Sequence, residues 1–245
     1  MEMTLRRILF LAAVCFLFLS GCGKEESKED SSKKNPGLEE MELLRFENPE
    51  NENLADMLQQ NGSGMMVQIG AGSQLGSGVI YGTEKGEILI LTAAHVLEEA
   101  EGSVRVTFSD GFSVACDTFS GFELADVGLV RVDGTGIPEE NLSHYLKVCV
   151  DKESFDAVKP GDGCIVMGSR TGVAADAYEG TILDNWIYMD DYAQYMIWVK
   201  AEAKPGMSGG GLFDSEGHFL GILSGENEDG EIAAVPLSLI LVEMN

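Results

Sequence analysis

The chain has 245 residues, of which 44% are hydrophobic, enough to bury a sizeable core. Its length fits one domain, because β-barrel proteins of this size are often single domains. Asp and Glu number 41 against 16 Lys and Arg, which gives a formal net charge of −25. That charge argues against a nucleic-acid partner, because phosphates are bound by clustered cations. It is typical of a soluble anionic surface, and a preference for cationic substrates is the alternative.

The first 22 residues have the pattern of an export signal. Arg6 and Arg7 precede an apolar run over residues 8–19. This run is too short to span a bilayer, which takes about 20 residues. The sequence LSGC at residues 19–22 resembles a bacterial lipobox. The resemblance implies removal of residues 1–21, a diacylglycerol on the thiol of Cys22, and anchoring to the extracytoplasmic face of a bacterial cell membrane. An ordinary secretory signal with an incidental cysteine is the alternative.

The next two segments connect this signal to a folded domain. Residues 22–37 are rich in Ser, Lys and Glu and poor in apolar residues, which predicts a flexible tether. Residues 38–63 form an N-terminal segment with helical patterns. Within it Leu54, Met57 and Leu58 stand at i, i+3 and i+4, which predicts a short helix packed on the domain that follows. We expect that domain to cover residues 64–245.

From residue 64 onward, short apolar or alternating segments are separated by turn signals. We expect strands in the first half over residues 65–70, 75–81, 87–91, 104–108, 112–117 and 124–132. In the second half we expect them over 146–150, 164–168, 178–189, 193–200, 212–213, 218–224 and 232–236. Short helices are predicted at 138–145 and 237–244. Many short strands with frequent turns indicate an all-β sandwich or barrel.

Three stretches carry candidate catalytic chemistry. TAAH places His95 just after a strand, ADVGLV places Asp126 at the entrance to another, and KPGMSGGG places Ser208 in a glycine-rich turn. A serine nucleophile needs an accessible hydroxyl and preorganised donors for the oxyanion, and a tight turn supplies both. Serine attacks, histidine takes its proton, and a buried aspartate holds the imidazole. The order of these residues in the chain is that of chymotrypsin-type double barrels.

Together with the glycine-rich strand GSGVIYG, these three motifs resemble a trypsin-like serine peptidase, and more narrowly the bacterial Deg/high-temperature-requirement branch. The resemblance covers roughly residues 64–245. It implies an all-β fold of two six-stranded antiparallel barrels with the active site between them, followed by a short C-terminal helix. Many relatives of this branch carry a C-terminal PDZ domain, and we expect none in this sequence.

The resemblance also assigns roles. It implies that Ser208 is the nucleophile, His95 the general base and then the acid, and Asp126 the residue that orients His95. The backbone N–H groups of Gly206 and Ser208 are implied to form the oxyanion hole.

Position 207 departs from the pattern, because relatives carry Asp or Asn there and this chain carries Met207. A thioether makes no strong hydrogen bond, so we expect Met207 to pack beneath the loop. Either other contacts set the loop, or it is collapsed until substrate arrives. Zymogen activation of the trypsin kind, which needs an acidic residue at this position, is not expected.

Residues that contact substrate are implied at two places. The family position at the base of the primary pocket falls on Glu202, with Ala203 beside it; a buried carboxylate there would favour Lys or Arg at the cleaved position. The alternative is that Glu202 faces solvent or pairs with Lys200 or Lys204. We further expect a substrate peptide to add to a strand edge by β-augmentation. The residues of that edge are Ser224, Gly225 and Glu226.

The remaining polar residues indicate no cofactor. His144 and His218 fall in a predicted helix and beside a turn, and no spacing of His or Cys predicts a metal site. Cys116, Cys149 and Cys164 allow at most one disulfide in the exported domain. A Cys149–Cys164 pair and buried thiols that act as small hydrophobes are the two alternatives.

We therefore interpret the sequence as a lipid-anchored, extracytoplasmic serine endopeptidase that acts on protein or peptide substrates. Two alternatives stay open. One is a catalytically weak or silent module that holds extended peptides in the same cleft. The other is a processing protease with one partner substrate. The sequence leaves the oligomeric state open.

Overall fold

The computed structural model describes Leu38, Met41, Glu42 and residues 54–122, 124–227 and 229–244. The predicted export signal, the lipidation of Cys22 and the tether lie outside the described residues. None of the helices in the described part has the length and apolarity needed to cross a bilayer.

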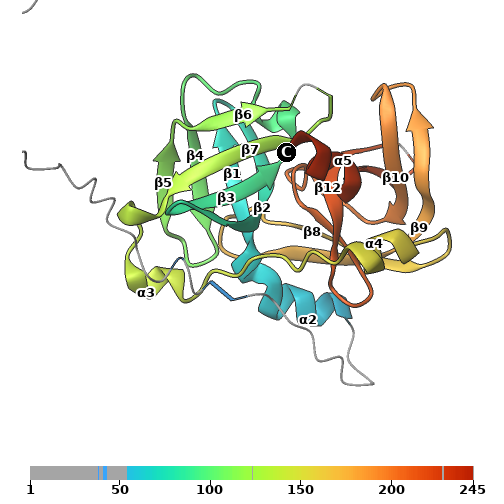
Figure 1. The fold of residues 1–245 in the computed structure, drawn as a ribbon, viewed down its shortest axis with the longest axis horizontal. Coiled ribbons are helices and arrows are strands. Elements are labelled where there is room, and N and C mark those ends of the chain that lie inside the picture. Colours follow the sequence, from blue (N-terminus) through green and yellow to red (C-terminus); the bar gives the residue numbers. More distant parts are fainter. Residues whose placement is uncertain (1–37, 39–40, 43–53, 123, 228, 245) are drawn as a thin grey trace, which may run out of the picture. The chain divides into compact units, whose positions relative to one another are not determined.

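The first half of the domain is an antiparallel sheet of seven strands, ordered β5-β4-β1-β2-β3-β7-β6 (Figure 1). Its strands are β1 (Met66–Ala71), β2 (Gln74–Glu84), β3 (Glu87–Thr92), β4 (Val104–Phe108), β5 (Ser113–Cys116), β6 (Phe119–Gly121) and β7 (Gly128–Asp133). In β4 buried Val104, Val106 and Phe108 alternate with more exposed residues, which is the period of a strand with one face in the core.

This half differs from the closed six-stranded barrel that the sequence led us to expect. The edge strands β5 and β6 are only four and three residues long and do not pair with each other. Residues 117–118 carry the chain directly from one edge to the other. Where β5 and β6 would have to pair, Arg131 of β7 links the chain segments instead. Its N–H donates to the Thr118 carbonyl at 2.9 Å, and its carbonyl accepts from the Cys116 thiol at 2.8 Å. The sheet is therefore a curled half-barrel.

The second half is a closed antiparallel barrel of six strands, ordered β10-β13-β12-β11-β8-β9. Its strands are β8 (Gly163–Gly168), β9 (Asp176–Met189), β10 (Gln194–Ala201), β11 (Gly211–Asp214), β12 (Phe219–Glu226) and β13 (Glu231–Pro236). This half matches the predicted barrel. The predicted strand at 146–150 is wrong, because the chain there forms only isolated bridges, at Lys147 and at Cys149, which pairs with His218.

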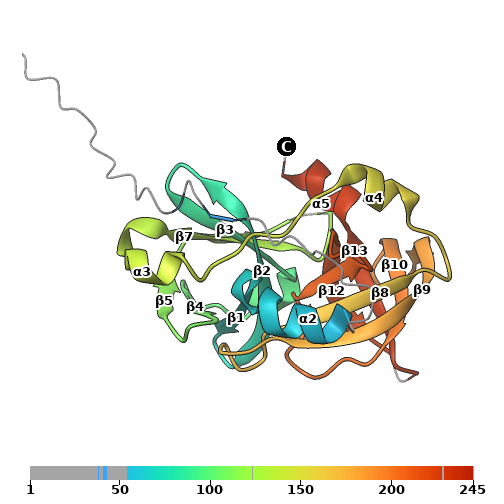
Figure 2. The ribbon, with the colours of Figure 1, turned by 90° about the horizontal axis from the view of Figure 1, so that it is seen from below.

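Short helices connect and cover the two halves (Figure 2). They are α2 (Leu54–Asn61), α3 (Glu139–Leu142), α4 (Lys152–Ala157) and α5 (Leu237–Glu243), with 3-10 turns η1 (Gly62–Met65), η2 (Ala94–Leu97) and η3 (Gly134–Gly136). Helix α2 lies against β8 and β9 with Leu58 fully buried, as the helical spacing predicted. Helix α5 packs on β12 and β13 through Leu237 and Ile240.

Candidate active site

The first candidate residue, His95, is positioned by the end of a buried strand. The apolar run of β3 is buried throughout, and the chain turns from it into η2 at Ala94. Val96 and Leu97 of η2 are buried, which anchors the turn, while 42% of the His95 side chain remains exposed. The imidazole is therefore fixed at its base and open to solvent.

Asp126 lies in the loop before β7, between the buried residues Ala125 and Val127. One carboxylate oxygen accepts the backbone N–H of His95 at 3.0 Å. The other lies 2.8 Å from His95 Nδ1 and also accepts the hydroxyl of Ser224. Three donors therefore hold a carboxylate that is only 19% exposed.

The two partners shift each other's protonation in opposite directions. The hydrogen bond with Asp126 raises the pKa of His95 above its ordinary value; burial opposes this, and the charges of Asp126 and Glu98 add to it. Burial raises the pKa of Asp126, but the hydrogen bonds from His95 and Ser224 outweigh it, so that pKa lies below its ordinary value. Asp126 thus stays ionised and favours an imidazole that accepts a proton.

Sequence reasoning placed Ser224 on a substrate-binding edge, and the structure also bonds it to Asp126. Leu223 pairs with Ala234 and Gly225 with Ala233, so Ser224 is an extra residue in β12. A bulge of this kind re-aims a side chain next to an active site. The bulge is formed by tertiary pairing, and no sequence signal identified it.

Tyr192, from the turn between β9 and β10, completes this side of the site. A Cβ added at Gly225 would meet its hydroxyl oxygen, whereas the next atom, Cζ, lies 3.7 Å away. The pKa of Tyr192 lies above its ordinary value, mainly because the phenol is buried. The neighbouring Ser224 hydroxyl lowers this pKa, and the charge of Asp126 raises it. The phenol therefore lies beside both Ser224 and Asp126 and takes the space of the side chain that Gly225 lacks.

Ser208 lies in a loop whose backbone donors fall into two groups. Met207 N–H donates to the Lys204 carbonyl, Gly209 N–H to the Leu223 carbonyl and Gly210 N–H to the Met207 carbonyl, at 2.8–3.0 Å. Within the described residues, the N–H groups of Gly206 and Ser208 have no acceptor. Gly206 has φ +94°, a conformation that favours glycine. The backbone N–H of Ser208 and that of Gly206 are thus both left open, as an oxyanion hole requires.

Met207 packs beneath this loop, as expected from its apolar side chain. It is 2% exposed, in a core cluster with residues of the second barrel, and its sulfur accepts the N–H of Lys204 at 3.3 Å. The loop therefore has an ordered conformation without a polar side chain at this position.

The Ser208 backbone is tied to the half of the domain that carries His95. Ser77 of β2 donates its N–H to the Ser208 carbonyl at 2.8 Å, and the Thr92 hydroxyl donates to the Ser77 carbonyl at 2.7 Å. Within the described residues, the Ser208 hydroxyl makes no hydrogen bond. Catalytic hydrogen bonds are often long without substrate and tighten when it binds, so this geometry is compatible with a nucleophile.

A cavity of about 200 Å³ opens beside Ser208. Its lining includes Ala203, Lys204, Pro205, Met207, Leu223 and Ile232, together with Ser224, Gly225 and Glu226. Glu202 does not line it. The Glu202 side chain is 63% exposed and lies 3.6 Å from the Lys204 ammonium, which is the alternative that the sequence left open.

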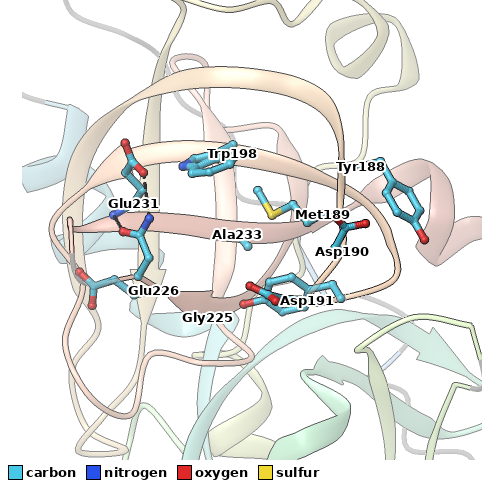
Figure 3. Close-up of a pocket in the computed structure, with 11 residues that line it drawn as sticks. Tyr188, Met189, Asp190, Asp191, Trp198, Gly225, Glu226, Glu231 and Ala233 are labelled. Atoms are coloured by element: carbon cyan, nitrogen blue, oxygen red, sulfur yellow. Dashed lines mark hydrogen bonds between the residues drawn. The ribbon is translucent and has the colours of Figure 1, made fainter.

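A larger cavity of about 770 Å³ adjoins the first and shares Gly225 and Glu226 with it (Figure 3). In Figure 3 the indole of Trp198 and the side chains of Glu231 and Glu226 border it on one side, with Tyr188 and Asp190 on the other. Next to Ser208, the edge of β12 thus has a small, mainly apolar cavity and a large one with acidic and aromatic walls.

The three cysteines that the structure describes, Cys116, Cys149 and Cys164, take no part in this site. No disulfide joins Cys149 to Cys164 in the structure. Cys164 is 2% exposed, and burial raises its pKa to about 12. Its thiol therefore stays protonated and packs as a small hydrophobe, which was the second alternative.

Comparison with known families adds to this geometry. The family model described as trypsin-like peptidase domain matches residues 76–222, more than half of the chain. The chain belongs to this trypsin-like family. The matched range of the trypsin-like domain contains His95, Asp126 and Ser208.

The trypsin-like domain is similar to the serine protease Do-like HtrA of Bacillus subtilis, at 25% identity over 86% of this chain and 46% of the relative. It is 30% identical to a probable periplasmic serine endoprotease, DegP-like, of Halomonas elongata, over 61% of this chain and 29% of the relative. The chain thus spans less than half the length of these relatives. The solved HtrA-type protease AlgW with tripeptide superimposes with a TM-score of 0.64 at 23% identity, covering 79% of this chain and 62% of that one. This supports the fold.

Proposed function

We propose that the protein is a serine endopeptidase that hydrolyses peptide bonds through an acyl-enzyme and is anchored to the extracytoplasmic face of a bacterial membrane. One observation carries the peptidase assignment: the imidazole of His95 is bonded to Asp126 at 2.8 Å, and the loop of Ser208 beside it leaves two N–H groups open. Family membership and the Deg-like relatives support it.

In the first half of the reaction, Ser208 Oγ forms a bond to the scissile carbonyl carbon while His95 Nε2 takes the hydroxyl proton. Asp126 accepts the hydrogen bond of Nδ1–H and stabilises the imidazolium. The carbonyl oxygen becomes an oxyanion that the N–H groups of Gly206 and Ser208 hold. When the C–N bond breaks, His95 gives its proton to the leaving amine, and the acyl group stays on Ser208.

In the second half, a water molecule attacks the acyl carbon and gives one proton to His95 Nε2. The second tetrahedral intermediate uses the same two backbone donors. Its collapse breaks the bond to Ser208 Oγ, which takes the proton back from His95 and releases the carboxylic acid. The enzyme returns to its starting state.

The strand edge supports an extended peptide as substrate. On the side of β11, pairing with β12 reaches only Ile222, so among the described strands none covers Ser224–Glu226 on that side. A peptide that adds there brings its carbonyl to Ser208 by β-augmentation. The cavity beside Ser208 is small and walled mainly by apolar side chains, so we propose an apolar residue of moderate size at the cleaved position rather than Lys or Arg.

The anchoring rests on the sequence. The apolar run over residues 8–19 followed by LSGC supports lipidation of Cys22. Expression in a bacterium fed an alkynyl fatty acid tests it. We expect label on the wild type and none on Cys22→Ser, and equal labelling of both excludes lipidation at this cysteine.

Peptide hydrolysis tests the activity. We expect the wild type to cleave casein and a peptide library after moderate apolar residues, and Ser208→Ala to cleave neither. Cleavage of one cellular protein but not of casein favours the dedicated processing protease. Peptide binding without cleavage favours the silent module. Cleavage mainly after Lys or Arg overturns the proposed specificity.

A further inference from the structure

The loop of Ser208 needs a fixed conformation, and its own side chains give it little support. Met207 offers only a thioether, which is a weak acceptor. The structure supplies a polar partner from elsewhere: Ser77, in the glycine-rich strand β2 of the other half of the domain. Its side chain is fully buried at 0% exposure.

Ser77 makes three hydrogen bonds at this point. Its hydroxyl donates to the Gly206 carbonyl at 2.7 Å and accepts the N–H of Ser169 at 2.8 Å. Its backbone N–H donates to the Ser208 carbonyl at 2.8 Å. One buried residue of the first half thus holds the carbonyls of the two residues whose N–H groups are open.

These bonds fix the two peptide groups that follow the residues with open N–H groups. The peptide after Gly206 is held at both ends, its carbonyl by Ser77 and its N–H by the Lys204 carbonyl. The peptide after Ser208 is held in the same way, by Ser77 and by the Leu223 carbonyl. The open N–H groups of Gly206 and Ser208 belong to the peptides that directly precede these two, so each is restrained through the fixed peptide next to it.

We propose that Ser77 is a positioning residue that keeps the oxyanion-hole loop in its active conformation, in place of the polar side chain that position 207 lacks. The inference rests on the proposed peptidase function. Ser77 acts through the loop and does not touch the substrate. Because it belongs to the other half of the domain, it also makes the oxyanion hole depend on the packing of the two halves.

The test compares wild type, Ser77→Ala and Ser77→Cys in kcat, KM, the rate of phosphonylation by a fluorophosphonate, and thermal unfolding. We expect Ser77→Ala to lower kcat and the phosphonylation rate by about tenfold or more, because oxyanion stabilisation is lost, with KM nearly unchanged. Ser77→Cys, whose thiol is a weak donor, should give an intermediate loss and keeps the test open if Ser77→Ala does not fold.

Cys116→Ala is the matched control. It removes a partly buried hydrogen bond of the first half, from the Cys116 thiol to the Arg131 carbonyl. It should lower the unfolding temperature without slowing phosphonylation. Wild-type kcat and phosphonylation in a folded Ser77→Ala or Ser77→Cys variant would overturn the inference. An inactive wild type would instead contradict the proposed function, so the two failures are distinguishable.

Discussion

His95 and Asp126 are joined by two hydrogen bonds, one from the backbone N–H and one at Nδ1, on different oxygens of the same carboxylate. The pair fixes both the position and the tautomer of the imidazole. Asp126→Asn keeps the shape but favours the wrong tautomer, so we expect kcat to fall by about 10⁴-fold with the fold intact. Peptidase assays and circular dichroism of the wild type and of Asp126→Asn check this. A loss of kcat under tenfold contradicts the role of Asp126.

The raised pKa of His95 predicts the pH dependence of activity. The general base works only when neutral, so kcat/KM should increase with pH, with a midpoint above the ordinary histidine value of about 6.5. Asp126→Asn weakens the hydrogen bond that is the main cause of the raised pKa and removes the carboxylate charge that adds to it, so the residual activity of this variant should have a lower midpoint. Glu98→Gln removes the charge that contributes least to the raised pKa of His95, so it should move the midpoint of activity only slightly. A wild-type midpoint below 6.5 contradicts this prediction.

Position 206 needs glycine because of its backbone conformation, since a side chain there would find enough space. Its φ is +94°, and the nearest atom to an added Cβ is Arg170 Cγ at an ordinary 3.4 Å. Gly206→Ala should therefore turn the N–H away from the oxyanion and lower kcat by about 100-fold, as loss of one donor does. Gly161→Ala is the control, because Gly161 has φ +96° in open space and should lose stability without losing activity.

Gly225 is required by the close approach of the Tyr192 hydroxyl. A methyl at this position displaces the phenol from the strand edge, so Gly225→Ala should raise KM for peptides several-fold and lower stability by about 1–3 kcal/mol, as overpacking does. Tyr192→Phe removes the atom that clashes and leaves Cζ at 3.7 Å. The double variant should therefore bind peptides better than Gly225→Ala alone. Strictly additive effects of the two changes would show that this contact does not exist.

Much of the fold follows from local patterns in the sequence. The strand at β4 has the residues that its alternation predicts, and β3 ends one residue beyond the apolar run that predicted it. Helix α4 was missed because its signal is a single capping residue, Asp151, whose carboxylate accepts the N–H groups of Glu153 and Ser154. Strand β6 was missed because a three-residue edge strand has too few residues to show a period.

In the candidate site, too, some residues were identified from local motifs and others are recognised only in the folded structure. The motifs around His95 and Asp126 identified two residues that the structure joins by hydrogen bonds, because each motif is a local pattern. The assignment of Ser208 as their partner stays a prediction. Tyr192 has no such signal, and the GSGVIYG stretch that contains Ser77 gave no indication of what this serine does. Their importance comes from contacts with Gly206 and Gly225, which are distant in the sequence and meet only after the strands pair. The expected place of Glu202 in the pocket came from a family position, and here its side chain pairs with Lys204 at the surface.

Reaction of the full chain with a fluorophosphonate, followed by mass spectrometry of its peptides, tests the central claim most directly. A nucleophilic serine with a neutral histidine base and two open N–H groups should take up one phosphonyl group, located on Ser208. Uptake should be lost in Ser208→Ala and greatly slowed in His95→Ala. A folded wild-type protein that remains unmodified, or is modified equally after Ser208→Ala, would contradict the account.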